Sequence, residues 1–154
     1  MIGIELQVEE AAWFERLPDI ERLLGEAAAA VGAEGAADIL LTTDEAVRKL
    51  NARFLGKDKP TNVLSFPAPA NPFNQLGDVA LALGVCEREA HEQGKPLADH
   101  VRHLLVHGLL HLLGYDHQAE DEAEAMECLE RAVLARLGVP DPYDAGEDRP
   151  VHVR

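Results

Sequence analysis

The sequence predicts a single domain of the α+β class, with strands and helices distributed along the whole chain. Its 154 residues suit one domain large enough to bury a hydrophobic core. Short segments in which apolar residues alternate with others are typical of strands, and longer segments with apolar residues three and four positions apart are typical of helices. Both kinds of segment recur between residues 2 and 137, so we expect a fold built from both.

Four segments are expected to be strands. Residues 2–8 alternate apolar and other side chains, and residues 36–43 form a short apolar run. Further strands are expected around residues 62–66 and over residues 78–83. Residues 67–77 lie between the last two and contain three prolines, which lack the N–H donors of a ladder or helix. This segment is therefore expected to be a long surface or functional loop.

Five segments are expected to be helices. The first opens with Pro18 and is stopped by Gly32, with apolar residues at helical spacing between them. For the second, Thr42 followed three residues later by Glu45 has the capping-box pattern, so Thr42 is expected to cap it. The expected helices cover residues 18–32, 43–55, 85–93, a segment that starts after Pro96, and residues 118–137.

The domain is expected to span residues 1–140, followed by a flexible acidic tail over residues 141–154 that is rich in proline and acids. No apolar run approaches the roughly 20 residues that a membrane span needs. The N-terminus carries acids where a signal peptide would be basic, so a cytoplasmic protein is expected. Cys86 and Cys128 have no CxxC spacing and are expected to be buried free thiols.

Charge is distributed unevenly along the chain. The formal net charge is −14, which argues against a general affinity for nucleic acid, and no DNA partner is expected. Residues 48–59 differ, because five cationic residues stand there against the single Asp58. This segment is either a solvated helix face followed by a charged loop, or one compact basic site on an acidic body. The cationic residues are Arg48, Lys49, Arg53, Lys57 and Lys59.

Residues 107–117, HGLLHLLGYDH, carry three histidines at the spacing of a metal site. His107 and His111 are four residues apart, so a helix places them on one face, where two imidazoles can bind one ion. Gly114 is expected to end the helix in the left-handed conformation, which turns His117 back toward the same ion. We therefore predict one Zn²⁺ ion on His107, His111 and His117, with a fourth position open to water or substrate.

Other interpretations of these histidines remain open. The spacing is that of the metzincin zinc peptidases, but Gly108 stands where those enzymes have their general-base glutamate. Histidine ligation also suits nickel, copper or iron, and the histidines of a helix need not bind metal at all. His103 lies four residues before His107 and is either an ordinary hydrogen-bonded histidine or a residue that supports the site.

Several motifs together resemble the YbeY family of bacterial rRNA maturation factors. They are HLLVHGLLHLLGYDH, LN followed by GKDKPTNVLSFP, LGDVALA and the late DPY, and the resemblance covers roughly residues 40 to 143. It implies an α+β fold with a small mixed β-sheet and surrounding helices, one of which carries the HxxxHxxGxxH motif of a zinc hydrolase. It also implies a zinc-dependent, single-strand-specific endoribonuclease that acts in rRNA maturation and ribosome quality control.

The resemblance assigns site residues. His107, His111 and His117 would bind zinc, with His107 serving catalysis as a ligand, while Lys57, Lys59 and Thr61 would lie near the mouth of the cleft and bind the substrate. The chain departs from the family at Leu55, where an arginine that faces RNA phosphate is typical. Either Lys57 or Lys59 supplies the missing charge, or this chain is a weaker nuclease.

Two other functions are considered beside the endoribonuclease. A ribosome-assembly binding protein with structural zinc is favoured by Leu55 and by the net charge, and its acidic face would suit basic proteins of the small ribosomal subunit. A zinc peptidase or amidase is disfavoured by Gly108. Few aromatic residues are available to stack on single-stranded RNA, and most of those near the motifs are expected in the core. They are Phe54, Phe66, Phe73 and Tyr115.

Overall fold

The computed structural model describes residues 1–116, 119–143 and 152–153, and within them the chain forms one mixed sheet with six helices. The expected α+β class is confirmed. In chain order the elements are β1 (Ile2–Val8), α1 (Ala12–Arg16), α2 (Ile20–Ala30), β2 (Gly35–Thr42), α3 (Asp44–Leu55), β3 (Val63–Pro67), β4 (Gln75–Ala82), α4 (Leu83–Gln93), α5 (Leu97–Leu112), α6 (Glu120–Arg136) and β5 (His152–Val153).

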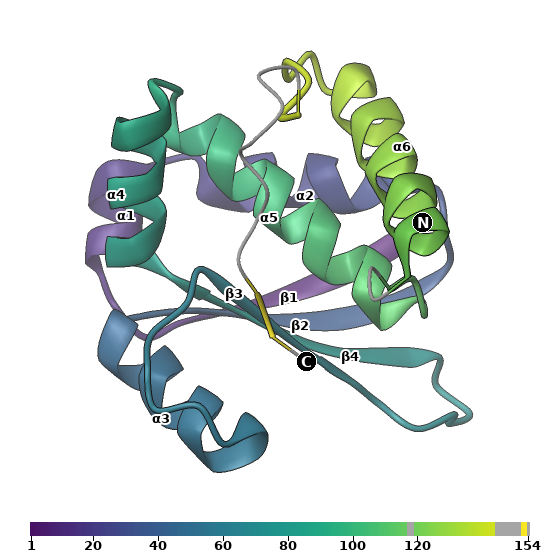
Figure 1. The fold of residues 1–154 in the computed structure, drawn as a ribbon, viewed down its shortest axis with the longest axis horizontal. Helices are drawn as coiled ribbons and strands as arrows, with labels where there is room; N and C mark the ends of the chain where they lie inside the picture. The colour runs from purple at the N-terminus through teal and green to yellow at the C-terminus, as the bar shows by residue number, and fades with distance from the viewer. Residues whose placement is uncertain (117–118, 144–151, 154) are drawn as a thin grey trace.

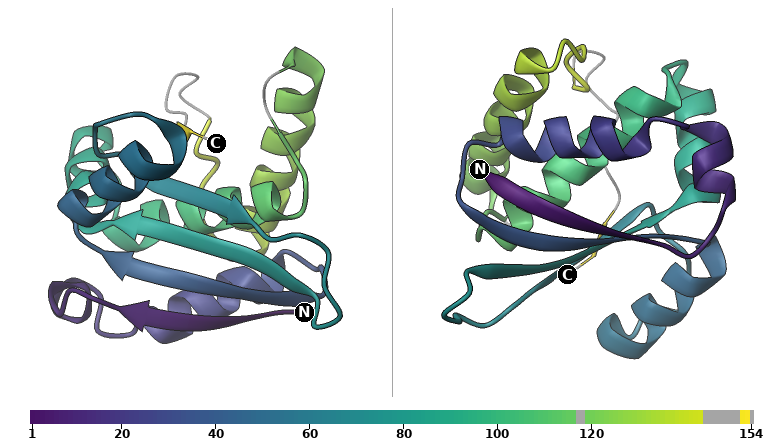
Figure 2. Two further views of the ribbon diagram at one scale, coloured as in Figure 1. Left: turned by 90° about the horizontal axis from the view of Figure 1, so that it is seen from below. Right: turned by 180° about the vertical axis from the view of Figure 1, so that it is seen from behind.

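Helices cover both faces of the sheet. Helices α2, α4, α5 and α6 lie on one face, and α3 lies on the other (Figures 1 and 2). In the described part of the chain the strand order is β1-β2-β4-β3-β5. Strand β2 pairs in parallel with β1 and β4, β3 pairs antiparallel with β4, and the short β5 pairs in parallel with β3. The sheet is therefore mixed, with its antiparallel pair beside β5.

The loop expected over residues 67–77 is shorter than the prolines suggested. β3 continues to Pro67 and β4 begins at Gln75, so the two strands form an antiparallel hairpin. The side chain of Asn71 organises the turn: its Oδ1 accepts from the backbone N–H groups of Phe73 and Gln75, and its Nδ2 donates to the carbonyl of Gln75. These bonds satisfy backbone groups at the tip of the hairpin. The pairing of β3 with β4 therefore extends further into residues 67–77 than their three prolines suggested.

The second helix is capped by a different residue from the one expected. The side chain of Thr43 accepts from the backbone N–H of Ala46 at 3.1 Å, as an N-cap does. Thr42 belongs to β2 instead, and its hydroxyl donates to Glu9 at 2.9 Å. The prediction of Thr42 was wrong by one residue because the strand runs through it and its side chain is held by another segment.

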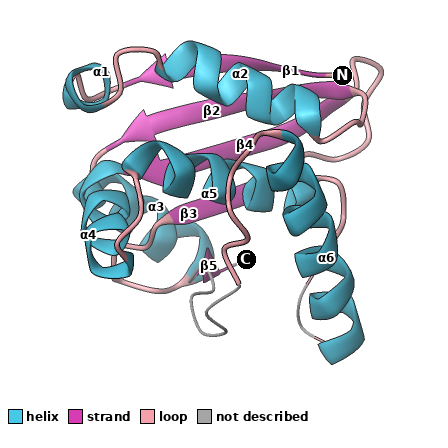
Figure 3. Cartoon of the chain, turned by 90° about the horizontal axis from the view of Figure 1, so that it is seen from above, coloured by secondary structure: helices cyan, strands magenta, loops and turns pink. Residues whose placement is uncertain are grey.

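Helix α5 crosses the sheet above β4 and β3, beside α2 (Figure 3). It also packs against α4 and α6, so most of its surface is covered. All but one of its residues from His100 to Leu112 are buried, as expected of a helix that is apolar on nearly every side. No helix in the described segments is both long enough and apolar enough to cross a membrane.

Helix α5 ends just before Gly114, as the sequence predicts. Gly114 has φ +102°, and its N–H donates to the carbonyl of His111 at 3.0 Å. The N–H of Tyr115 donates to the carbonyl of Leu110 at 3.0 Å. The two bonds are those of a Schellman motif, in which glycine at C′ reverses the chain.

The boundary of the expected acidic tail needs correction. Tyr143 lies in the segment assigned to the tail, but its ring is buried against α6. Residues 144–151 and 154 lie outside the described residues. The folded domain therefore extends at least to Tyr143.

The two cysteines are free thiols but differ in exposure. Cys86 is buried, and burial raises the pKa of its thiol. Cys128 is exposed on α6, so the expectation that both thiols are buried was wrong for this residue.

Candidate metal centre

His107 and His111 lie one turn apart on the last part of α5. Their ring centroids are 4.8 Å apart with an angle of 74° between the planes, and only 3% and 4% of the two residues are exposed. The helix therefore brings together two of the three predicted ligands, as their i, i+4 spacing requires. His117 lies outside the described residues. Within residues 1–116 and 119–143, no group of three or more histidine, cysteine or acidic side chains is arranged to hold a metal.

Glu130 was not identified from the sequence, yet it contacts His107 of this pair directly. It lies on α6, is fully buried, and its Oε2 is 3.1 Å from Nδ1 of His107. Its other oxygen, Oε1, is 2.7 Å from Nε2 of His103 and accepts from the hydroxyl of Tyr143 at 2.7 Å. One carboxylate thus joins α5, α6 and the segment that ends at Tyr143. No sequence pattern distinguishes Glu130 from the many other acids of α6, so its role could not be predicted.

The hydrogen bonds determine the charge state of this cluster. Burial raises the pKa of Glu130, but hydrogen bonds from His103 and His107 outweigh it and hold the pKa well below its usual range. Burial lowers the pKa of His103, despite the opposing effect of Glu130. The Glu130 carboxyl is therefore ionised, and His103 is a neutral donor to it. His103 is hydrogen-bonded as expected, and it shares its acceptor with His107.

These donors fit a metal such as zinc. An ionised carboxylate can only accept hydrogen bonds, so Nδ1 of His107 carries the proton and Nε2 carries the lone pair that a metal requires. Metal-bound histidines commonly donate their other N–H to a carboxylate in this way. His107 and His111 supply two imidazoles on one helix face, and His117, if it binds the same ion, would complete a three-histidine set.

Gly108 packs α5 tightly onto the sheet. A Cβ atom at this position would lie 3.0 Å from Cγ1 of Val79 and 3.1 Å from Oγ of Ser65. The Ser65 hydroxyl also donates to the carbonyl of Gly108 at 3.1 Å. These distances are shorter than ordinary contacts of a Cβ atom, so a glutamate here would force Val79 or Ser65 to shift. The close packing therefore disfavours the general-base glutamate of the zinc peptidases at this position.

The predicted basic segment is partly neutralised within the chain. Arg48 forms ion pairs with Glu45 and Asp58, so its charge is already compensated. Lys57 and Lys59 lie on the exposed loop between α3 and β3, and neither forms an ion pair with the described residues. The neighbouring side chain of Asn51 donates to the carbonyl of Lys59 at 2.9 Å, which ties this loop to α3.

Leu55, Thr61 and Asn62, which flank the basic loop, are largely buried. Thr61, expected near the substrate, is only 5% exposed. Asn62 of the same motif is buried, and its side chain donates to Glu89 at 3.0 Å. Leu55 packs beside a second apolar cluster between α3 and the sheet. Position 55 therefore supports the packing of α3, and the basic loop begins just after it.

Three of the four aromatic residues expected mostly in the core are exposed. Phe54, Phe73 and Tyr115 are 56%, 85% and 41% exposed, while Phe66 is half-buried and packs edge-on against Phe54. The expectation was wrong because Phe54 lies on the exposed side of the last turn of α3, Phe73 lies in a turn, and Tyr115 follows the end of α5. Tyr115 directly follows Gly114 and so lies next to the histidine motif.

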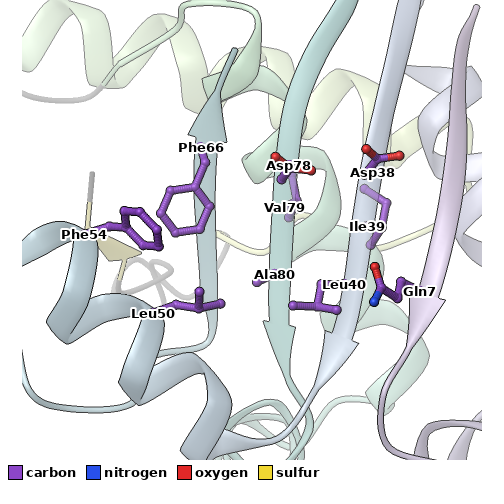
Figure 4. Close-up of a pocket in the computed structure, with 10 residues that line it drawn as sticks. All are labelled: Gln7, Asp38, Ile39, Leu40, Leu50, Phe54, Phe66, Asp78, Val79 and Ala80. Carbon is purple, nitrogen blue, oxygen red and sulfur yellow. The ribbon is translucent and has the colours of Figure 1, made fainter.

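A separate groove of about 470 Å³ lies on the α3 side of the sheet (Figure 4). Phe54 and Phe66 line one end, and Asp38 and Asp78 stand side by side on paired positions of β2 and β4 at the other. Burial, and then the charge of Asp38, raise the pKa of Asp78. Because Ser65 faces α5 and the next residue, Phe66, faces the opposite side, this groove is distinct from the histidine cluster.

Comparisons with known proteins agree with the motifs. The family model described as Endoribonuclease YbeY matches residues 6–138. A protein named Endoribonuclease YbeY from Maricaulis maris is 52% identical over 149 residues, which cover 93% of this chain and 92% of that protein. A protein of the same name from Rhodopseudomonas palustris is 56% identical over 137 residues, covering 83% of this chain and 72% of that protein.

A solved structure shares the fold. The solution structure of TM1509 from Thermotoga maritima superposes with a TM-score of 0.55 at 23% sequence identity. The match covers 97% of this chain and all of that chain.

The packing of Gly108 generates a testable prediction. We expect Gly108→Glu to lower the free energy of unfolding by at least about 1–3 kcal/mol, because overpacking a core costs that much before the buried charge is counted. Urea denaturation of the metal-free protein measures this change. Gly25→Glu, at a position inside α2 where an added Cβ meets nothing within 4 Å, is the matched control. A Gly108→Glu variant as stable as the wild type would show that the helix does not need this close approach.

Proposed function

The chain belongs to the Endoribonuclease YbeY family, and we propose that it is a zinc-dependent endoribonuclease acting on single-stranded rRNA. We place its action in the cytoplasm, in rRNA maturation and ribosome quality control. The observation that carries the zinc dependence is the pair of buried histidines on one turn of α5, with Nδ1 of His107 bonded to a buried carboxylate. A carboxylate partner alone does not identify a metal ligand, because His100 bonds Glu89 in a similar way; two buried imidazoles on one turn of a helix suit an ion more specifically.

In this proposal His107, His111 and His117 hold one zinc ion. A bound zinc ion supplies Lewis-acid chemistry, polarising a phosphoryl oxygen and activating a water molecule. Such chemistry reduces the need for a separate strong base, which fits the presence of Gly108 where the zinc peptidases have a glutamate. The missing glutamate argues against the alternative of a zinc peptidase or amidase.

Other residues of the chain would bind the RNA. Lys57 and Lys59 are exposed, and their ammonium groups would contact phosphates. Thr61 is only 5% exposed, so its contribution to substrate binding would be small. The exposed ring of Tyr115, beside the histidine motif, would stack on an unpaired base, and Phe54 offers a second exposed ring. Stacking of this kind requires bases outside a duplex, which favours single-stranded substrate.

A second candidate function is a ribosome-assembly protein in which zinc is structural. Leu55 in place of the family's arginine and the net charge of −14 favour it. Exposed acids in the first turn of α6, Glu120, Asp121 and Glu122, would suit basic proteins of the small ribosomal subunit. Cleavage measurements on metal-quantified protein separate this candidate from the nuclease.

We expect His107→Ala to abolish both zinc binding and cleavage of a labelled single-stranded rRNA fragment, because the ligand set loses one of three nitrogens. His91→Ala, which removes an exposed histidine on α4, is the matched control and should retain both properties. Zinc content and cleavage rate are measured on the same preparations. Equal cleavage by the wild type and a zinc-free His107→Ala protein would contradict the nuclease and favour the binding protein.

We expect Lys57→Gln and Lys59→Gln each to weaken binding of single-stranded RNA and to reduce the salt dependence of binding. Removing one lysine–phosphate interaction should lower the slope of log K against log salt by about 0.7 in magnitude. Fluorescence anisotropy at several salt concentrations measures the slope. Lys49→Gln removes an exposed lysine from the middle of α3 and is the control. The same slope for all four proteins would exclude the loop as the phosphate-binding segment.

A further inference from the structure

Glu130 accepts three hydrogen bonds at the centre of the molecule, and we propose that it is the positioning residue for the metal ligand His107. The inference rests on the proposed zinc function and adds a residue to it. Through its Oε2, 3.1 Å from Nδ1 of His107, the carboxylate would fix both the rotation of the ring and the nitrogen that carries the proton. His107 then presents Nε2 to the ion before any metal arrives.

The position of the carboxylate is itself determined by two other donors. Tyr143 and His103 both bond Oε1 at 2.7 Å, which holds the plane of the carboxylate and directs Oε2 toward His107. The rings of His103 and Tyr143 also pack edge-on, with centroids 5.5 Å apart. A carboxylate held at one oxygen in this way cannot turn to follow a moving imidazole. His107 must therefore conform to it, which is the condition for preorganisation of a ligand.

The tautomer follows from the direction of these bonds. A carboxylate oxygen accepts hydrogen bonds, so Nδ1 of His107, 3.1 Å from Oε2 of Glu130, is the donor in their bond. His107 is thereby restricted to the form with a proton on Nδ1. In a solvated imidazole both neutral tautomers are accessible, and part of the population would present a protonated Nε2 that cannot bind an ion. Removing that fraction, and holding the ring still, raises metal affinity.

The chain contains a matched pair that isolates this effect. His100 lies on the same helix, and its Nε2 is 2.8 Å from Oε1 of Glu89, with the histidine only 3% exposed on its side chain. Glu89 and His100 thus form another acid–imidazole bond, with the Glu89 side chain 22% exposed, nearly two turns before His107 along α5. They differ in that His100 is not a proposed ligand. Loss of the Glu89 bond should cost stability without changing the metal centre.

The test compares Glu130→Gln with Glu89→Gln. Glutamine keeps the size of the side chain but offers one acceptor oxygen and an NH₂ donor, so it cannot accept from all three partners. We expect zinc affinity, measured by competition with a chromophoric chelator, to fall by about 10–100-fold in Glu130→Gln. In Glu89→Gln it should stay within about twofold of the wild type, although both variants melt at a lower temperature than the wild type.

A second readout does not depend on metal or on the folding of Glu130→Gln. ¹⁵N NMR of metal-free wild-type protein, with the His107 signals assigned from a His107→Gln sample, reports which ring nitrogen carries the proton. We expect protonated Nδ1 and unprotonated Nε2. The Nε2-protonated form in the wild type would overturn the inference, even if Glu130→Gln fails to fold.

The outcomes separate this inference from the function on which it rests. If wild-type protein binds no zinc, the proposed metal centre is wrong and the inference is overturned with it. If wild type and Glu130→Gln bind zinc equally well, the metal centre stands and only the positioning role of Glu130 is overturned. Equal losses of affinity in Glu130→Gln and Glu89→Gln would likewise overturn it, since they would show a general loss of packing.

Discussion

A charged carboxylate buried at Glu130 is the constraint on which the arrangement of the helices depends. A buried charge is tolerated only when hydrogen bonds compensate for its lost hydration. Glu130 obtains them from His103, His107 and Tyr143, which lie on two other segments of the chain. Removing one hydrogen-bond partner of a buried polar group typically costs about 1–3 kcal/mol, and more where the group is charged. Helices α5 and α6 and the segment that ends at Tyr143 must therefore keep their mutual positions, and the histidine pair is positioned with them.

The packing of α5 on the sheet supplies the second condition. Gly108 brings the helix backbone against Ser65 and Val79, so the turn that carries His107 lies close to the hairpin of β3 and β4. The loop that precedes β3 carries Lys57 and Lys59, and the side chain of Asn51 connects this loop to α3 through a hydrogen bond. One strand thus connects the cationic loop with the turn of the proposed metal ligands. Phosphate binding and metal chemistry would be joined through a short, rigid part of the sheet.

The sequence was informative wherever a local rule determines structure. Helical spacing predicted the pairing of His107 and His111, and Gly114 predicted the end of α5, because both depend only on nearby residues. Thr42 was mistaken for the helix cap because its strand pairing and its bond to Glu9 come from distant segments. Glu130 was missed for a related reason: among the many acids of α6, only the packing of that helix against α5 distinguishes it.

The exposure of the aromatic rings was also mispredicted from the sequence. An aromatic residue near a motif is expected in the core on composition alone, yet Phe73 lies at the tip of a hairpin and Tyr115 follows a helix end. Their exposure depends on where the elements stop, which is the part of a fold that sequence patterns determine least well. The Lys57 and Lys59 assignment came from charge and resemblance, and it stays a prediction.

The central claim is that a zinc ion is held by imidazole nitrogens at the end of α5. Zinc K-edge X-ray absorption of the purified, zinc-loaded protein tests it most directly, since it reports the atoms bound to the metal. We expect three imidazole nitrogens at about 2.0–2.1 Å and one oxygen ligand in a tetrahedral shell. Sulfur in the shell, or fewer than three imidazoles, would contradict it.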